Sequence, residues 1–392
     1  MVKGNFKSGA IIAGGHFASL AAARNLGQHG ISVYIVDSEN CLTRYSKYTK
    51  GFFRCPPEKE ESRFIEYLVG LSSRYSGISG SVLFASTDEQ VRIFSQNREM
   101  LSEHYIVSVP GWDVTKYLYD KRLSRILAKQ QQVPIPETII SSCLQDILAL
   151  DLSYPLVMKP AITPHFVSVT KKKAYKANNP QELVSLYNQI SEIMNPEEIL
   201  IQEFIPGGTK NLYSCFGYFK EGRLVAGYAA KRLRQHPIEF GRSSTYVVST
   251  FMPELEALAT QLLTGIGYTG MAEVEFMFDP KHSRYEFLEV NPRIWGWLNL
   301  SILAGVDIPY IAYADLVAEP YHSGRFIEGA KWIHLATDVP TAFEEILHGR
   351  LTFQDYFRSI HGSRDAVFCP NDPLPFLVEL CLIPYIAIRR GF

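Results

Sequence analysis

Hydrophobic and polar residues alternate with a period of two along residues 272–279 and 285–290, on either side of a Pro-Lys-His-Ser turn. This alternation predicts a β-hairpin with two different faces. For a loop with an odd number of residues, the paired strands share faces. The apolar face is then expected to hold Val274, Phe276, Leu288 and Val290. The polar face is expected to hold Glu273, Glu275, Glu289 and Asn291.

The polar face of this hairpin is a candidate cation site. Carboxylates on adjacent strands repel one another unless a positive charge lies between them. Oxygen ligands from Glu and Asn suit a hard cation such as Mg²⁺, so we expect Glu275, Glu289 and Asn291 to bind metal. The alternative is that these side chains form only the solvated face of a half-buried hairpin.

The N-terminal segment has the pattern of a βαβ unit. Residues 10–13 and 33–36 are apolar, and an alanine-rich helical stretch separates them. Gly14, Gly15 and His16 form a turn that could cradle a phosphate, and Asp37 could hold a ribose hydroxyl, which gives a dinucleotide hypothesis. The spacing of glycines typical of dinucleotide sites is missing, so a plain tight turn is the alternative.

Three further patterns indicate where elements begin and end. A strand at 82–85 leads to Thr87 and Asp88, either of which could cap a helix over 89–101. Lys121 opens a second helix that runs to about residue 131, and residues 180–194 form a third. Lys159 ends an apolar strand, where its compact ammonium group suits a polyphosphate.

Composition narrows the class of protein. The chain has 392 residues, 46% of them hydrophobic, which is enough for two or three compact domains. Its 39 basic and 40 acidic residues give no global field for nucleic acid or acidic membranes. The six cysteines form no CxxC pair and the N-terminus lacks an apolar signal segment, so we expect a cytoplasmic protein.

The C-terminal residues 374–388 are strongly apolar and precede Arg389 and Arg390. The run is short for a membrane span and is broken by Glu379 and Pro384. We therefore expect a helix docked on the protein core, with peripheral membrane or partner binding as the alternative and an integral membrane protein disfavoured.

The order EVEF, FLEVNPR, WG and AGVDIP resembles the ATP-grasp superfamily. Within that superfamily the chain is most similar to the carboxylate–amine ligase branch, among predicted carboligases akin to D-aspartate ligase. The segments that carry this similarity are STDEQ, EFGRSST and DPLPFLVEL. The resemblance implies a combined α/β and α+β fold, in which a Rossmann-like N-terminal domain precedes the ATP-grasp fold. We expect the Rossmann-like domain at 1–112, a small lobe at 113–200, a large lobe with the metal site at 201–325, and a C-terminal extension packed on the core at 326–392.

The resemblance also implies roles for particular residues. Lys121 and Lys159 would face the phosphates of ATP, and Gln202 and Glu203 would lie at the hinge that holds adenine and ribose. Arg234 would hold a substrate carboxylate or acyl phosphate, and Arg293 would offset charge on the transferring group. The remaining substrate contacts implied are Gly15, His16, Ser243 and Ser244.

One stretch departs from the family pattern. Many members have a glycine-rich flap where this chain has AITPHFVSVTKKKAY. We expect a stiffer flap with its tip at residues 163–165, and we leave Lys171, Lys172 and Lys173 unassigned because lysine runs are usually solvated.

Together these features predict an ATP-dependent ligase that joins a small carboxylate to an amine through an acyl phosphate. Its cofactors would be ATP and Mg²⁺, with Mn²⁺ as the alternative ion, and its partners would be small molecules, with a homodimer as one open assembly. Three alternatives stay open: an ATP-dependent carboxylase, a catalytically silent ATP-binding or membrane-associated regulator, and a nicotinamide oxidoreductase based on the N-terminal turn.

Overall fold

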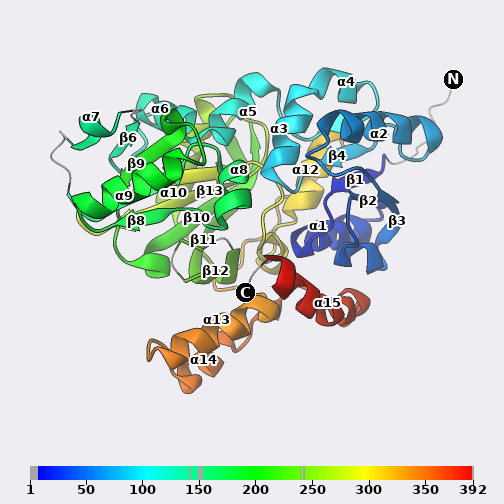
Figure 1. Cartoon of the computed structure of the whole chain (residues 1–392). Helices are drawn as coiled ribbons and strands as arrows, with labels where there is room; N and C mark the ends of the chain where they lie inside the picture. The colour runs from blue at the N-terminus through cyan, green and yellow to red at the C-terminus, as the bar shows by residue number, and fades with distance from the viewer. Residues whose placement is uncertain (1–7, 141–142, 149–152, 239, 242, 391–392) are drawn as a thin grey trace.

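The computed structural model describes residues 8–140, 143–148, 153–238, 240–241 and 243–390. Within them the chain forms three β-sheets, each with its own helices (Figure 1). Helices and sheets occur together throughout, as the predicted mixed α/β fold class requires.

The first sheet is parallel and has the strand order β3-β2-β1-β4-β5. Its strands are β1 (Ala10–Ala13), β2 (Val33–Asp37), β3 (Thr49–Arg54), β4 (Val82–Phe84) and β5 (Ile106–Val107). Its helical segments are α1 (Phe17–Gln28), the 3-10 helix η1 (Leu42–Tyr45), α2 (Glu61–Arg74), α3 (Asp88–Gln96) and α4 (Arg98–Ser102). All four residues of β1 are buried, as expected for a strand covered on both faces. The predicted βαβ opening is therefore confirmed.

The second sheet is antiparallel, with the order β6-β9-β7-β8. Its strands are β6 (Thr138–Ile140), β7 (Leu156–Pro160), β8 (Tyr175–Ala177) and β9 (Ile199–Glu203). Its helical segments are α7 (Leu144–Leu148), α8 (Thr163–Thr170), α9 (Pro180–Ser191) and the 3-10 helix η2 (Pro196–Glu198). The expected flap at 163–165 is wrong, because these residues begin α8, with Pro164 in its first turn where proline is tolerated.

The third sheet has the order β14-β13-β10-β11-β12-β15-β16. Its strands are β10 (Leu212–Lys220), β11 (Arg223–His236), β12 (Ser243–Thr250), β13 (Gly270–Asp279), β14 (Arg284–Asn291), β15 (Lys331–Ile333) and β16 (Arg364–Asp365). The helical segments associated with it are α5 (Trp112–Tyr119), α6 (Lys121–Gln130), η3 (Gly208–Asn211), α10 (Pro253–Thr264), α11 (Asn299–Leu303) and α12 (Ile308–Leu316). All neighbouring strands are antiparallel except β15 and β16.

The predicted hairpin is formed by β13 and β14, and it contains one irregularity. Glu273 lies opposite Asn291 and Glu275 opposite Glu289, but Phe276 lies opposite Phe287. Leu288 is therefore the extra residue of a bulge, so Phe287 takes the place on the apolar face that Leu288 was expected to fill.

The two faces of the third sheet pack against different neighbours. On one face, Val274, Phe276 and Phe287 share a core with residues of α5, α6 and α10. On the other, Phe216 and Tyr228 share a core with α1, α11 and α12. Glu273 and Glu275 alternate with Val274 along β13, so they point to the face that meets the N-terminal domain.

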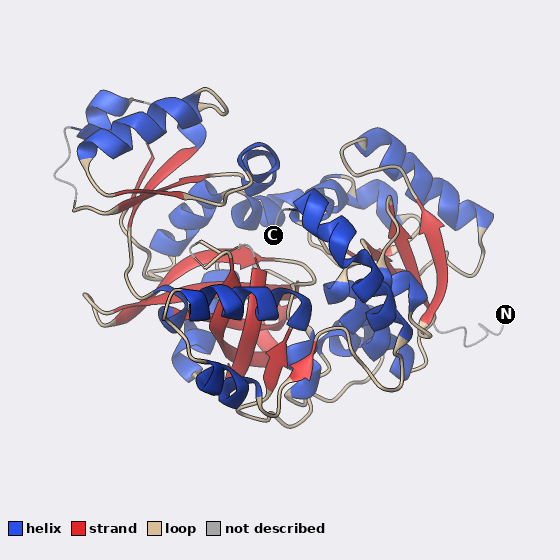
Figure 2. Cartoon of the chain, turned by 60° about the horizontal axis from the view of Figure 1, so that its bottom comes forward, coloured by secondary structure: helices blue, strands red, loops and turns tan. Residues whose placement is uncertain are grey.

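The C-terminal part contains α13 (Leu335–Leu347), α14 (Phe353–Ile360) and α15 (Leu374–Arg390). Helices α13 and α14 project from the body, whereas α15 lies beside the N-terminal domain, where it contacts η1 (Figures 1 and 2). Among the described residues, no helix combines the length and apolar character needed to cross a bilayer. The domain limits remain predictions, although β9 crosses the expected limit at 200 and β15 and β16 extend the third sheet beyond 325.

Candidate active site

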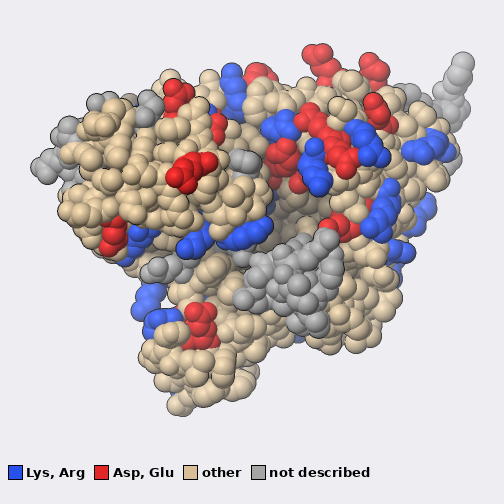
Figure 3. Space-filling model, viewed as in Figure 1, with Lys and Arg blue, Asp and Glu red and all other residues tan. Residues whose placement is uncertain are grey.

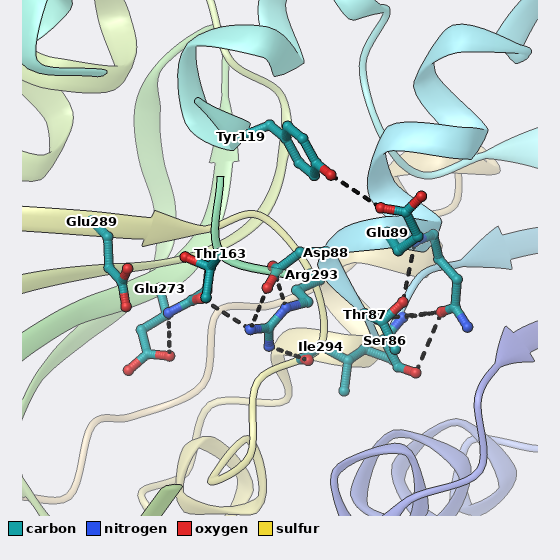
Figure 4. Close-up of polar contacts among 12 residues, drawn as sticks. Ser86, Thr87, Asp88, Glu89, Tyr119, Thr163, Glu273, Glu289, Arg293 and Ile294 are labelled. Carbon is teal, nitrogen blue, oxygen red and sulfur yellow. Dashed lines mark hydrogen bonds and ion pairs between the residues drawn. The ribbon is translucent and has the colours of Figure 1, made fainter. Parts of the chain in front are cut away.

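The polar face of the β13–β14 hairpin gathers three carboxylates and one carboxamide. The Asn291 Nδ2 atom donates to Glu273 Oε2 at 3.2 Å and to Glu275 Oε1 at 3.0 Å. Figure 4 shows Glu273 and Glu289 near each other, both to the left of Arg293. The expected juxtaposition of Glu275, Glu289 and Asn291 is therefore present in the structure.

Arg232, from β11, partly neutralises this cluster. One guanidinium nitrogen lies 3.2 Å from Glu275 Oε1 and 3.5 Å from Glu273 Oε1. Burial, followed by the neighbouring charge of Glu275, raises the pKa of Glu273 to about 7. One arginine therefore does not offset the negative charge gathered here, and the donor set fits a hard cation.

Glu289, the third carboxylate, lies among lysines from the second sheet and α6. Its Oε2 atom is 3.3 Å from the Lys121 Nζ atom, and its Oε1 atom is 3.7 Å from the Lys173 Nζ atom. Burial opposes ionisation of Glu289, but Lys121, Lys173 and Lys159 together hold its pKa well below the usual range. Lys121 also donates to the Thr163 hydroxyl at 2.5 Å, which joins α6 to the start of α8.

Lys159 is the penultimate residue of β7, in the second sheet. Burial and the charges of Arg125 and Lys121 lower its pKa well below the ordinary lysine value. A group in this environment gains from an added anion, because the anion would restore the charged form. This is the behaviour expected of a phosphate-binding lysine.

Arg125, on α6, connects β9 to the bulge in β14. It donates to the carbonyls of Phe287 and Leu288 at 2.9 and 2.7 Å and to Gln202 Oε1 at 3.3 Å. The bulge turns two successive carbonyls toward one guanidinium group, which fixes β14 against β9. Gln202 is therefore a buried residue through which β9 contacts α6.

Glu203, at the end of β9, lies at a small separate cavity of about 50 Å³ lined also by Glu137, Leu156 and Lys281. The Lys281 Nζ atom lies 2.6 Å from Glu203 Oε1. Lys281 belongs to the β13–β14 turn, so this ion pair crosses between the second and third sheets.

Arg293 links the hairpin to the N-terminal domain. It is 2.6 Å from Asp88 Oδ1 and donates to Asn291 Oδ1 at 3.0 Å (Figure 4). Burial works against its charge, but Asp88 raises the pKa of Arg293. A cavity of about 110 Å³ is lined by Asp88, Tyr119, Lys121, Thr163, Lys173, Glu289, Asn291, Arg293 and neighbouring residues.

Arg234 does not reach this cluster in the structure. Its guanidinium donates to both oxygens of Asp338 at 2.9 and 2.8 Å and to the Ser359 hydroxyl at 2.9 Å. It also lies 4.4 Å from the centre of the Tyr246 ring. These contacts tie β11 to α13 and α14, so the Arg234 donors are already engaged away from the polar face of the β13–β14 hairpin.

Ser243 and Ser244 lie on β12, opposite His236 and Gln235 of β11. Ser244 is buried, and the Ser243 hydroxyl donates to the Ser244 carbonyl at 3.4 Å. The structure thus places the two serines at the start of β12, paired with the end of β11. Glu239 and Arg242 of the same run lie outside the described residues.

Gly15 and His16 lie at the carboxyl edge of the parallel sheet. His16, together with Gly14, Asp37, Arg54 and Glu58, lines an open cavity of about 900 Å³. The Gly15 amide donates to Asp37 Oδ2 at 2.7 Å, so Asp37 stabilises the turn itself. Thr87 and Gln90 also line this cavity, next to Asp88 and Val91 of the smaller one.

A second set of ligand-type side chains lies at the far end of the hairpin. One atom each from Asp279, His282 and Glu286 lies within 4.8 Å of the others. Arg284 donates to Glu286 at 2.8 Å and the Lys281 amide to Asp279 at 2.9 Å. These carboxylates therefore already have cationic or amide donors.

Sequence reasoning missed Arg232, Lys173 and Arg125. Arg232 belonged to the basic run already noted, but a bulge between β11 and β12 sends it and Arg234 to different neighbours. Lys173 was hidden among three consecutive lysines. The only signal for Arg125 was a charge at a position that its helix buries.

Residues 197–332 match the family model described as "ATP-grasp in the biosynthetic pathway with Ter operon". The solved N5-carboxyaminoimidazole synthetase from Staphylococcus aureus, complexed with ADP, superposes with a TM-score of 0.66 at 17% identity, covering 87% of each chain. The chain therefore has the ATP-grasp fold and contains an ATP-grasp domain.

Two further proteins are similar to the chain. The D-aspartate ligase of Enterococcus faecium (strain Aus0004) is 28% identical over 273 residues, which are 64% of this chain and 62% of that relative. The chain thus matches less than two thirds of the relative's length. The solved L-amino acid ligase from Bacillus licheniformis has a TM-score of 0.63 at 14% identity, over 83% of this chain and 78% of that one.

Proposed function

We propose that the chain is an ATP-dependent ligase that joins a carboxylate to an amine and releases ADP and phosphate. One observation carries this proposal. Glu275, Glu289 and Asn291 lie together on the third sheet, and Lys121 from α6 contacts this group at Glu289. Oxygen ligands opposite ammonium groups suit a metal-bound polyphosphate. The similarity to a D-aspartate ligase and to an L-amino acid ligase supports formation of a C–N bond.

The nucleotide would lie between the second and third sheets. Gln202 and Glu203 at the end of β9 would border adenine and ribose, beside the Lys281 ion pair. Lys121 and Lys159 would hold the phosphates, because the Lys121 ammonium lies 3.3 Å from Glu289 and the lowered pKa of Lys159 means that an added anion would favour its charged form. Release of the Glu203–Lys281 pair would open this edge to the sugar.

The metal would lie on Glu275, Glu289 and Asn291. The buried acids fit this role because Arg232 alone does not neutralise them. Mg²⁺, with Mn²⁺ as an alternative ion of the same hard-ligand class, would neutralise phosphate charge and orient the terminal phosphoryl group when bound.

The reaction would proceed in two displacements. A substrate carboxylate oxygen attacks the γ-phosphorus of ATP, the bond to the β,γ-bridging oxygen breaks, and ADP leaves. The neutral amine then attacks the acyl carbon, loses a proton to solvent, and expels inorganic phosphate. Arg293, adjacent to Asn291, would offset the negative charge on the transferring group and on the tetrahedral intermediate.

The small-molecule substrates would approach from the N-terminal domain. The cavity beside Gly15 and His16 lies at the carboxyl edge of a parallel sheet, where ligands usually bind. The start of α3 borders both cavities, because Thr87 and Gln90 line this one and Asp88 and Val91 line the smaller one that contains Arg293. Ser243 and Ser244 pair with the end of β11, and Arg234 pairs with Asp338, so these contacts give less support for a role in substrate binding.

The proposal predicts that Mg²⁺-ATP turnover to ADP rises when pools of small carboxylates and amino acids are supplied together. Glu289→Gln should lower this turnover at least about 100-fold while keeping the fold, because it removes one anionic ligand. Glu192→Gln, the same change at an exposed residue of α9's C-terminal end, is the control and should leave turnover unchanged.

Turnover is followed by ADP release and the fold by circular dichroism. Full activity of Glu289→Gln would contradict the assignment. Turnover that requires bicarbonate and no amine would instead identify a carboxylase.

A further inference from the structure

The three consecutive lysines after α8 have different surroundings. Lys171 adopts a left-handed conformation (φ 60°) that ends the helix, and its ammonium donates to the Ser168 carbonyl at 2.7 Å. The Lys172 ammonium lies 4.9 Å from the centre of the Tyr175 ring. Of the three, Lys173 contacts Glu289: its Nζ atom lies 3.7 Å from Glu289 Oε1. The turn at Lys171 therefore sends one lysine of the run to the candidate site.

Lys173 is placed by the element that replaces the glycine-rich flap of the family. Helix α8 begins at Thr163, beside Lys121, and ends at Thr170, so both ends of its segment border the site. Figure 3 shows Lys and Arg side chains along the lower edge of this lobe, next to a hollow in the surface. The segment thus brings a positive charge where a flap would supply backbone amides.

Lys121 and Lys173 approach opposite oxygens of the same carboxylate. A divalent cation on Glu289 would take over the neutralisation of that carboxylate and release both ammonium groups for phosphate oxygens. Lys173 lines the cavity of about 110 Å³ that also contains Arg293, whereas Lys159 is not among the lining residues. Lys173 is therefore on the side of the site where a group would be transferred.

We propose that Lys173 binds the terminal phosphoryl group of ATP. This inference rests on the proposed function and adds a third phosphate-binding lysine to Lys121 and Lys159. Because ADP lacks the terminal phosphoryl group, the contribution of Lys173 is specific to ATP. A lysine that only stabilised the lobe would affect both nucleotides equally.

The test measures the affinities of ATP and ADP by isothermal titration calorimetry with Mg²⁺, using a non-hydrolysable ATP analogue as a check against turnover. Lys173→Ala should weaken ATP binding about 10-fold or more, since hydrogen bonds to charged groups are among the stronger ones. Its affinity for ADP should change less than about 2-fold, and Lys173→Arg should recover most of the ATP affinity.

Lys172→Ala is the matched control, because it removes the same charge one residue away and should leave both affinities unchanged. Circular dichroism and thermal unfolding establish that each variant is folded. Equal losses for ATP and ADP in Lys173→Ala, or no loss, would overturn the inference while the ligase proposal stands. Failure of the unaltered protein to bind either nucleotide would overturn both.

Discussion

Arg232 and Arg234 show how two side chains close in sequence can serve different parts of the molecule. Arg232 meets Glu273 and Glu275, while Arg234 meets Asp338, which is fully buried. Between them the pairing of β11 with β12 shifts register, so the usual rule that residues two apart share surroundings does not hold. Arg234 thus has the environment of a residue that holds α13 to the sheet.

We predict that Arg234→Ala lowers the free energy of unfolding by about 3–5 kcal/mol, because it leaves the buried Asp338 carboxylate unpaired. Urea denaturation measures the change. Arg223→Ala, at an exposed position of the same strand, should change stability by less than about 0.5 kcal/mol. If Arg234→Ala kept full stability and specifically weakened carboxylate binding, the residue would instead contact substrate.

The sequence predicted which residues lie at the site better than it predicted which side chains contact them. The period of two in β13 and β14 was sufficient to place Glu275 and Glu289 on the same face, because strand geometry fixes which residues share a face. It could not reveal that Lys173 approaches Glu289, since that contact depends on how the second sheet meets the third.

At the scale of elements, α3 connects the N-terminal domain to the site. Thr87 caps it, with a reciprocal hydrogen bond to Gln90, and Asp88 in its first turn pairs with Arg293. Of the two predicted cap candidates, Thr87 and Asp88, Thr87 is the cap in the structure. The position of the Arg293 guanidinium therefore depends on the start of one helix.

Thr87→Ala should lower the free energy of unfolding by about 1 kcal/mol through loss of the cap, and should also reduce ligase turnover by displacing Asp88. Thr352→Ala removes a cap from α14, in the projecting C-terminal part, and should cost similar stability without reducing turnover. The comparison uses denaturation and ADP release on the same samples. Equal turnover in both variants would contradict a role for α3 in placing Arg293.

Two local features were not predicted from the sequence: helix α8, in place of the expected flap, and the bulge at Leu288. Residues 163–170 contain Thr, Val and Phe, which have no strong helix preference, so their helix depends on packing such as that of Phe166 in the core of the second sheet. The bulge at Leu288 depends on Arg125, which draws two successive carbonyls toward α6. Both causes are distant in sequence.

At the scale of the whole molecule, the C-terminal segment holds the N-terminal domain. Asp372 accepts hydrogen bonds from Arg24, Ser46 and the Lys47 amide at 2.7–2.9 Å. Burial disfavours its charge, but these donors lower the pKa of Asp372. Its contribution to stability is therefore present above the ordinary Asp pKa of about 3.9 and is lost as pH falls through the lowered value.

We predict that Asp372→Ala lowers the free energy of unfolding at pH 7 by about 3 kcal/mol, because buried Arg24 loses its partner. The difference from the unaltered protein should shrink as the pH falls through the range where Asp372 takes up its proton. Denaturant titrations between pH 3 and pH 7 measure both effects. A difference that grows toward acid pH would contradict this account.

The parts of the fold that were predicted correctly depend on residues close together in the sequence. The N-terminal βαβ unit follows from short apolar runs and an intervening helix. The shared core, in which Leu20 of α1 and Phe216 of β10 belong to one cluster, depends on contacts across the length of the chain. A single sequence contains no direct signal for such packing.

ATP-driven acyl transfer to an amine requires an acyl phosphate, and trapping that intermediate tests whether the protein is a ligase. The protein is incubated with Mg²⁺-ATP and pools of small carboxylates, with hydroxylamine in place of the amine. The account predicts hydroxamate and ADP in equal amounts, and neither with Glu289→Gln. Binding of ATP with no ADP or hydroxamate from any carboxylate pool would contradict the account and identify a nucleotide-binding protein without ligase activity.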